Sequence, residues 1–459
     1  MGKRTKKKNV DRSEKIHNTG IIYTADSRLN YLAVIPGLAL IAATLLDFLM
    51  CVSMPSMKNS QFATYSDLFR MGFWASFIAG AVFLIAYYMI YVRGAAGMAG
   101  IASGLRGQMH WVFFALFAVC IVVSTIINGI DDAALHGIPY RNQGFLHVLL
   151  YIGVLCTVSM HLKTPGLRRI IIAGYLMTAD LIAIAAAAFL GGVSIAAFEG
   201  KKGLCAIFFN GNHYGYFLVM AVLLAAGLWI EEDKRSLRVF GMVSLVLNMI
   251  ILFVNDSMGC ILAVFIVLLC AVAVLSVRGG GLNRRAAAAA GLLFAVPIAG
   301  ACIISARAGD ASGFEAISKE VTELLGDIES LFTASITDSA GHNRWGLWSL
   351  TAGYIADRPI LGYGCEGISA MLQAATGRSS AHNELLTYAA FFGIPAAVFY
   401  CSGVLASLWC SMRKQISCSG RLPFFMASAG YFISSLVGVS MFYTTPFFFI
   451  FLGCALTEE

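Results

Sequence analysis

Long apolar stretches, separated by short polar segments, recur along almost the whole chain. A helix that crosses the hydrocarbon core of a bilayer needs about 20 mostly apolar residues, and its backbone hydrogen bonds must be satisfied within the segment. The composition agrees, because 59% of the residues are hydrophobic, 12% are charged and the mean hydropathy is +0.78. These features predict an all-α integral membrane protein without a large soluble domain.

Twelve stretches are candidate membrane spans, so we expect about 12 transmembrane helices. The spans are Tyr31–Met50, Phe73–Val92, Trp111–Ile127, Phe145–Met160, Ile170–Leu190, Tyr214–Ile230, Val239–Val254, Cys260–Val277, Ala286–Ile304, Leu385–Trp409, Leu422–Val439 and Phe447–Leu456. Several are shorter than about 20 residues. The last two, separated at Pro446, could also form one kinked hairpin.

Lysines and arginines are distributed unevenly between the two predicted sides. With the N-terminus in the cytoplasm, the inner segments carry 22 of the 32, eight of them in the tail 1–30. Because basic loops stay on the cytoplasmic side, the sequence predicts a multi-pass protein of the inner (cytoplasmic) membrane with both termini cytoplasmic. We interpret the tail as a retained anchor that contacts anionic membrane lipid, and not as a nucleic-acid-binding segment.

One segment departs from the pattern of short loops. The predicted organisation is a tail (1–30), nine spans (31–304), a long extracytoplasmic loop (305–383) and three further spans (384–459). Loops of this length are often functional. Within it, Phe314–Phe332 predicts a surface helix, and Trp345–Ile355 predicts a short amphipathic or re-entrant helix.

Cysteine spacing indicates neither a metal nor a cofactor. The 12 cysteines fall mostly inside apolar runs, and none forms a CxxC pair or a Cys/His cluster with metal-ligand spacing. We therefore expect them to be small core residues.

Three polar clusters lie at the predicted outer ends of spans. They are Asn210-Gly-Asn212-His213-Tyr214-Gly215, Asn255-Asp256-Ser257, and a set in the long loop made of His342-Asn343-Arg344-Trp345-Gly-Leu-Trp348, Asp357-Arg358-Pro-Ile-Leu-Gly-Tyr-Gly364 and Ala381-His382-Asn383-Glu384. Polar groups are costly in a membrane protein, so such clusters are candidate functional sites.

The third cluster resembles the signature domain of the O-antigen ligase and surface polysaccharide polymerase superfamily. The resemblance rests on an Arg with a Trp four residues later, on the segment "DRPILGYG" and on "HNELL" followed by a glycine, over about Asn343–Pro395. It implies a GT-C-like fold with the active site outside the membrane. It does not separate polymerases, ligases and protein-glycosylating members.

The resemblance also implies a reaction and its residues. The donor would be an undecaprenyl-diphosphate-linked glycan and the acceptor a glycan or lipid-linked glycan, with no metal and with a chain-length regulator as a further partner. By resemblance, Arg344 would stabilise the departing diphosphate and His382 would accept the proton of the acceptor hydroxyl. The candidate substrate-binding residues are Asn210, Asn212, His213, Trp348, Arg358, Asn383 and Glu384.

The sequence departs from this pattern at one position. Many members carry another Arg after a Ser before the eighth span, where this chain has Ser257-Met258-Gly259. Arg358, Arg378, Lys201 or Lys202 could supply the second diphosphate contact in its place.

Each candidate also has a structural explanation. His382, Asn383 and Glu384 suit a helix start, as does the cluster from Asn210 to Gly215. Arg344, Trp345, Trp348 and Tyr354 suit a membrane interface, Asp256 and Ser257 suit a turn, and the mid-span Asp180 suits an interhelical hydrogen bond. Glu384 could instead orient His382.

Two other functional classes fit a chain with many spans. A transporter or flippase of lipid-linked glycans would need several charged groups at mid-membrane, where this sequence has little besides Asp180, and it shows no internal repeat. A peptidoglycan-type polymerase would be expected to carry an essential acid in its large outer loop. Asp310, Asp338 and Asp357 stand in no recognisable context for it, so a polysaccharide polymerase, and next a ligase, is the preferred hypothesis.

Overall fold

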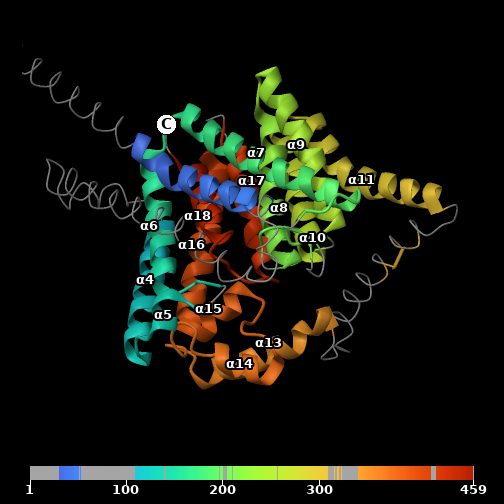
Figure 1. Ribbon diagram of the computed structural model, residues 1–459. Coiled ribbons are helices and arrows are strands. Elements are labelled where there is room, and N and C mark those ends of the chain that lie inside the picture. The colour runs from blue at the N-terminus through green and yellow to red at the C-terminus, as the bar shows by residue number, and fades with distance from the viewer. Residues whose placement is uncertain are drawn as a thin grey trace, which may run out of the picture.

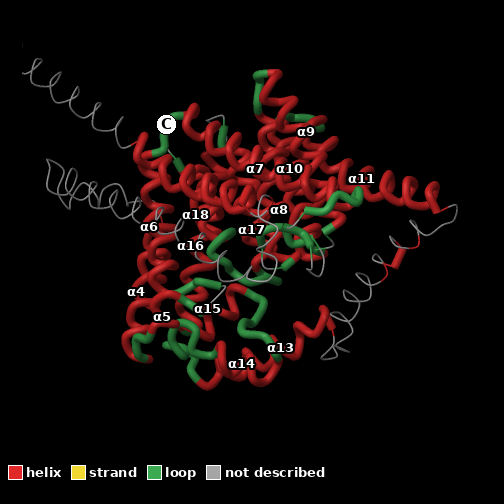
Figure 2. The backbone as a smooth tube through the Cα atoms, viewed as in Figure 1, coloured by secondary structure: helices red, strands yellow, loops and turns green. Residues whose placement is uncertain are grey.

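The computed structural model describes residues 30–50, 52, 109–138, 141–195, 197–199, 204–208, 210–255, 257–308, 315, 318–319, 322, 340–414 and 420–457. Its described part contains helices and connecting loops, with no strand (Figures 1 and 2). The predicted span Phe73–Val92 and nearly all of the predicted surface helix Phe314–Phe332 lie outside the described residues.

The first described helix, Asn30–Met50, is drawn in blue in Figure 1. The labelled helices are α4 (Met109–Asn128), α5 (Asp132–His136), α6 (Phe145–His161), α7 (Pro165–Leu190), α8 (Gly211–Glu231), α9 (Arg235–Val254), α10 (Met258–Arg278), α11 (Arg284–Ala308), α13 (Ala340–Asp357), α14 (Ser369–Thr376), α15 (Glu384–Phe392), α16 (Ile394–Lys414), α17 (Leu422–Ser435) and α18 (Thr445–Leu456).

Helix α8 forms the centre of the bundle. Nearly all of its side chains are buried, as expected for a helix that is apolar on every side. It packs against α9, α10 and α17. The contact with α17 is close, because a Cβ at Gly227 would lie only 2.4 Å from the Cα of Pro423.

The peripheral helices expose apolar side chains that suit a lipid environment. Val243, Val277 and Phe294 are each more than half exposed on α9, α10 and α11. Within the described residues, eight helices are long and apolar enough to cross a membrane. The chain is therefore a multi-pass membrane protein.

Eight spans is fewer than the 12 that the sequence predicted. Part of the difference is the span that lies outside the described residues. The rest arises because three predicted spans form short helices, with 17 residues in α6, 14 in α17 and 12 in α18. At about 1.5 Å per residue, α17 and α18 are too short to cross a bilayer.

The predicted span Leu385–Trp409 is not one helix. It is interrupted at Gly393, which separates α15 from α16. The two helices fold back on each other, because the Tyr388 and Tyr400 rings lie 4.7 Å apart and the Tyr400 hydroxyl donates to Glu384 at 3.0 Å. The start of α15 is thereby held inside the bundle. The helix predicted at Trp345–Ile355 is confirmed within α13, at the end of the bundle away from the C-terminus (Figure 1).

Gly393 makes this reversal sterically feasible. Its φ of +93° is a conformation that side chains disfavour, and a Cβ there would lie 1.9 Å from the carbonyl oxygen of Ile360. The neighbouring Ile394 N–H donates to the carbonyl of Pro359 at 2.8 Å. The turn is thus pinned against the segment that follows α13.

Gly393→Ala should strongly destabilise the protein, because the methyl group would collide with the Pro359–Leu361 backbone and strain φ. We expect a loss of about 2 kcal/mol or more, seen as a lower melting temperature of the detergent-purified protein. Gly291→Ala in α11 is the matched control, since a Cβ there meets nothing within 4 Å. Equal melting temperatures for the two variants would contradict a steric requirement at Gly393.

Candidate active site

The start of α8 contributes a buried histidine. Asn210 caps this helix, because its side-chain oxygen accepts from the His213 N–H at 3.0 Å. His213 is 4% exposed, and its Nδ1 lies 2.7 Å from the hydroxyl of Tyr443. The helix-capping explanation of Asn210 is confirmed, and the cap fixes where His213 lies.

The first two polar clusters of the sequence come together. Asn255 Nδ2 donates to the Gly211 carbonyl at 2.8 Å, and the Ser257 hydroxyl donates to Asn212 Oδ1 at 3.0 Å. The turn before α10 is therefore fastened to the start of α8. Asp256 lies outside the described residues.

The loop before α15 holds His382 from both sides. On one side, Trp348 Nε1 on α13 donates to the carbonyl of Ala381 at 3.0 Å. On the other, Asn383 caps α15 by accepting from the Leu386 N–H at 3.0 Å. His382 itself has φ +51°, an uncommon conformation for a residue with a side chain. Trp348 and Asn383 thus position the histidine through the backbone.

Three arginines interact electrostatically with His382. Burial, together with the positive charges of Arg378, Arg344 and Arg141, lowers the pKa of His382 to about 4. Its imidazole is therefore neutral at pH 7. His213 interacts electrostatically with His382 and Arg141, so the two histidines belong to one site. Arg344 also acts on Tyr216 of α8 and on Cys260 of α10.

Arg141 was missed by the sequence reasoning. It lies between α5 and α6, is 3% exposed, forms a short ion pair with Glu366 and donates to the Ser369 hydroxyl at 3.0 Å. Its Nε has no hydrogen-bond partner. The available signal was the short polar run Arg141-Asn142-Gln143, which comes just before an apolar stretch.

Unusual backbone conformations gather around this arginine. The described non-glycine residues with positive φ are Asn142, Ala206, Glu366 and His382. Asn142 follows Arg141 directly, Glu366 is its ion-pair partner, and His382 is within its electrostatic reach. Strained backbone of this kind tends to cluster at functional sites.

Glu384 faces a different set of neighbours from those expected. It is 1% exposed, and its carboxylate accepts from the hydroxyls of Tyr388 and Tyr400 at 3.4 and 3.0 Å. Ser435 at the end of α17 and Ser440 after it also hydrogen-bond to this carboxylate. These hydrogen bonds anchor the start of α15.

Arg358 is also engaged elsewhere. Its Nη1 donates to Asn128 Oδ1 at 3.1 Å, and its guanidinium lies 4.5 Å from the Tyr363 ring centre. Of the two proposed replacements that the structure describes, Arg358 and Arg378, it is Arg378 that acts electrostatically on His382. Lys201 and Lys202 lie outside the described residues.

Asp180 lies away from these groups, within the membrane-spanning part of α7. It accepts from Ser244 and Asn248 of α9, each at 2.6 Å. The interhelical hydrogen bond expected for this acid is confirmed.

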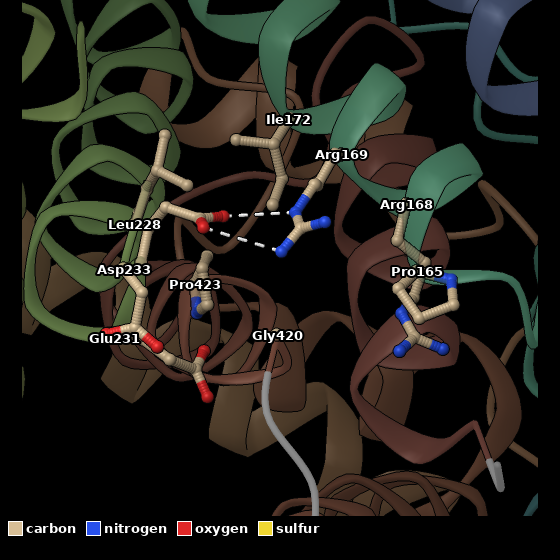
Figure 3. Close-up of a pocket in the computed structure, with 10 residues that line it drawn as sticks. Pro165, Arg168, Arg169, Ile172, Leu228, Glu231, Asp233, Gly420 and Pro423 are labelled. Atoms are coloured by element: carbon tan, nitrogen blue, oxygen red, sulfur yellow. Dashed lines mark hydrogen bonds and ion pairs between the residues drawn. The ribbon is translucent and has the colours of Figure 1, made fainter. Parts of the chain in front are cut away.

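A charged cavity of about 60 Å³ lies at the other end of α8. The 21 residues of α8 place it about 30 Å from His213. Arg168 and Arg169 of α7 lie on one side and the acids that end α8 on the other, with Arg169 paired to Glu232 (Figure 3). Arg168 also donates to Thr457 at 3.1 Å, so this cluster joins the ends of several helices.

Comparison with known proteins adds one finding. No curated protein matches the chain. Residues 243–401 match the family model described as "O-Antigen ligase". The matched range runs from α9 into α16 and contains Arg344, Trp348 and His382, whereas Arg141 and His213 lie before it. Over residues 243–401, this multi-pass membrane protein is therefore similar to the O-antigen ligase family.

Proposed function

We propose that the protein is a membrane glycosyltransferase that polymerises surface polysaccharide from undecaprenyl-diphosphate-linked glycan. The observation that carries this proposal is that His382, fixed between Trp348 and Asn383, is neutral and lies within the electrostatic reach of Arg141, Arg344 and Arg378. Guanidinium groups bind phosphate oxygens with directed, charge-assisted hydrogen bonds. A neutral imidazole among them can accept a proton. The site lies, in the proposed topology, on the extracytoplasmic side.

The proposed step is a displacement at the anomeric carbon of the donor glycan. The acceptor hydroxyl oxygen bonds to this carbon as its proton moves to His382. The bond between the carbon and the diphosphate oxygen breaks, and its electron pair leaves with undecaprenyl diphosphate. Arg344 and Arg141 stabilise the charge that develops on the leaving group. In this scheme the arginines supply the positive charge that the departing diphosphate needs.

The same arginines make the base responsive to the donor. Burial and the positive charges hold the pKa of His382 near 4, which makes it a weak base. A bound diphosphate neutralises those charges, so the pKa of His382 rises towards the pH at which the enzyme works. Proton removal is thereby favoured only when the donor is present.

The remaining candidates suit glycan recognition. Asn210, Asn212 and Asn383 each have the side-chain oxygen engaged, which leaves the amide nitrogen to donate to a glycan hydroxyl. Trp348 offers its ring while its N–H is bonded to Ala381. In this proposal Glu384 anchors α15, and Arg358 is peripheral.

A ligase is the second candidate, because the matching family is described as O-antigen ligase. It would transfer a finished glycan from the same donor to a different acceptor. The transporter hypothesis gains no support from Asp180, whose described partners are the neutral side chains of Ser244 and Asn248. A proton relay would need further ionisable groups along the path.

His382→Ala and Arg344→Ala should each lower glycosyl transfer by about 100-fold or more, through loss of the base or of leaving-group stabilisation. The measurement is product formation from lipid-linked glycan by the reconstituted protein. His136→Ala is the control, since His136 is paired with Asp132 on α5 outside the site. Wild-type activity in both site variants would remove these residues from the mechanism.

The products distinguish the two candidates in a strain that lacks the gene and carries each variant. Single lipid-linked units accumulate if a polymerase is lost. Long lipid-linked chains accumulate, without attached glycan, if a ligase is lost. Membrane abundance of each variant is measured by immunoblot, so that failure to insert is recognised.

Arg141→Gln should weaken donor binding and raise KM for the lipid-linked glycan by about 10-fold or more. It also leaves Glu366 as a buried unpaired carboxylate, which alone would destabilise the fold. The double variant Arg141→Gln/Glu366→Gln keeps a neutral pair of similar shape. Recovery of wild-type KM in the double variant would mean that Arg141 serves only as the partner of Glu366.

Arg378→Gln should raise the pKa of His382 by about one unit, because a nearby positive charge is removed. The neutral imidazole reacts with diethyl pyrocarbonate, so the pH midpoint of His382 modification, read by mass spectrometry, should move upward. Arg358→Gln should leave the midpoint unchanged. An unchanged midpoint in Arg378→Gln would refute the cationic control of this histidine.

A further inference from the structure

Tyr443 and His213 form a buried pair that the reaction scheme above does not use. The Tyr443 hydroxyl lies 2.7 Å from His213 Nδ1, and the two residues are 5% and 4% exposed. Phe208 and Phe442 pack against the Tyr443 ring, at 5.4 and 4.9 Å between ring centres. The phenol is thus held by packing as well as by its hydrogen bond.

The segment that carries Tyr443 is itself fastened to the site. It lies between α17 and α18, and the Phe442 N–H donates to the carbonyl of Arg141 at 3.4 Å. At its end, the Met441 N–H donates to the Thr445 hydroxyl at 2.9 Å. Tyr443 is therefore fixed relative to Arg141 on one side and to α18 on the other. A fixed hydroxyl can impose one orientation on the imidazole that it contacts.

We propose that Tyr443 is a positioning residue that sets the tautomer and orientation of His213. Its O–H donates to Nδ1, so the ring proton lies on Nε2. That nitrogen then donates to an oxygen of the lipid-diphosphate-linked glycan. This inference rests on the proposed function for the identity of the ligand.

The chemistry of the two side chains favours a hydrogen bond in which Tyr443 is the donor and His213 the acceptor. A phenol is a good donor and an imidazole nitrogen a good acceptor, so the O–H to Nδ1 bond is the stronger arrangement. Which nitrogen of a histidine is protonated is set by the hydrogen bond at the other nitrogen. The ligand offers phosphate and hydroxyl oxygens, which suit a fixed N–H donor. His382 and Arg141, the electrostatic neighbours of His213, place the ring at the proposed reaction centre.

A double-mutant cycle tests whether Tyr443 acts through His213. Tyr443→Phe should reduce the transfer rate by about 10-fold, whereas in a His213→Gln background it should reduce the rate by less than about 2-fold. Tyr175→Phe is the matched control. It removes another buried hydroxyl, which donates to the Phe217 carbonyl at 3.0 Å outside the site, and it should leave the rate within about 2-fold.

Two results of the cycle would overturn the proposal. One is a wild-type transfer rate for Tyr443→Phe. The other is an equal loss in both backgrounds, which would show that Tyr443 affects transfer without His213. The melting temperature of each variant separates these outcomes from general unfolding.

A spectroscopic measurement does not depend on glycosyl transfer. The chain has eight histidines, and comparing ¹⁵N-histidine spectra of wild type and His213→Gln assigns the His213 signal. We expect a protonated Nε2 and an unprotonated Nδ1, with this pattern altered in Tyr443→Phe and unchanged in Tyr175→Phe. A proton on Nδ1, or an identical spectrum in Tyr443→Phe, would refute the positioning role. Absence of transfer by the wild-type protein would refute the proposed function alone.

Discussion

The reversal at Gly393 places the beginning of a helix inside the bundle, and the arrangement of the site depends on it. Because α15 runs back against α16, Glu384 is carried to a position that is 1% exposed. A carboxyl group there is tolerated only when it is hydrogen-bonded, and the Tyr388 and Tyr400 hydroxyls fulfil this condition. His382 precedes Glu384 by two residues. The bonds that hold the start of α15 therefore also set the position of the histidine.

Around that half-buried histidine the protein concentrates positive charge. Three arginines act on His382, and the described ion pair among them is the one between Arg141 and Glu366. Keeping like charges close in a low-dielectric setting costs free energy unless an anion compensates them. The positive φ values of Asn142, Glu366 and His382 add local backbone strain. In the proposed reaction a bound diphosphate supplies the compensating charge, which links donor binding to the basicity of His382.

The candidate site draws on more of the chain than the range that matches the family model. Residues 243–401 provide Arg344, Arg378 and His382, but Arg141 and His213 precede this range and Tyr443 follows it. These residues meet because α8 is buried at the centre and its start lies against the segment before α18. At the opposite end of α8, the Arg169–Glu232 pair and the Arg168–Thr457 bond join helix ends. The candidate site at the start of α8 and the contacts of Arg168 and Arg169 at its end are thus separated by about the thickness of a bilayer.

The sequence by itself determined the all-helical membrane class, most span positions, the family resemblance, and Arg344 and His382 as candidates. Apolar run length reports transfer into lipid, and short motifs report local chemistry, so both can be interpreted without coordinates. Hydropathy could not detect the break at Gly393 or distinguish the short helices α17 and α18 from spans. Apolar composition does not record where a helix ends or turns back within an apolar stretch. Only the tertiary structure brought Arg141 and His213 within electrostatic reach of His382 and placed Tyr443 against His213. It also gave Glu384 and Arg358 their hydrogen-bond partners. Those contacts join residues up to 241 positions apart, as Arg141 and His382 are. Their geometry follows from helix packing, which no local pattern in the sequence records.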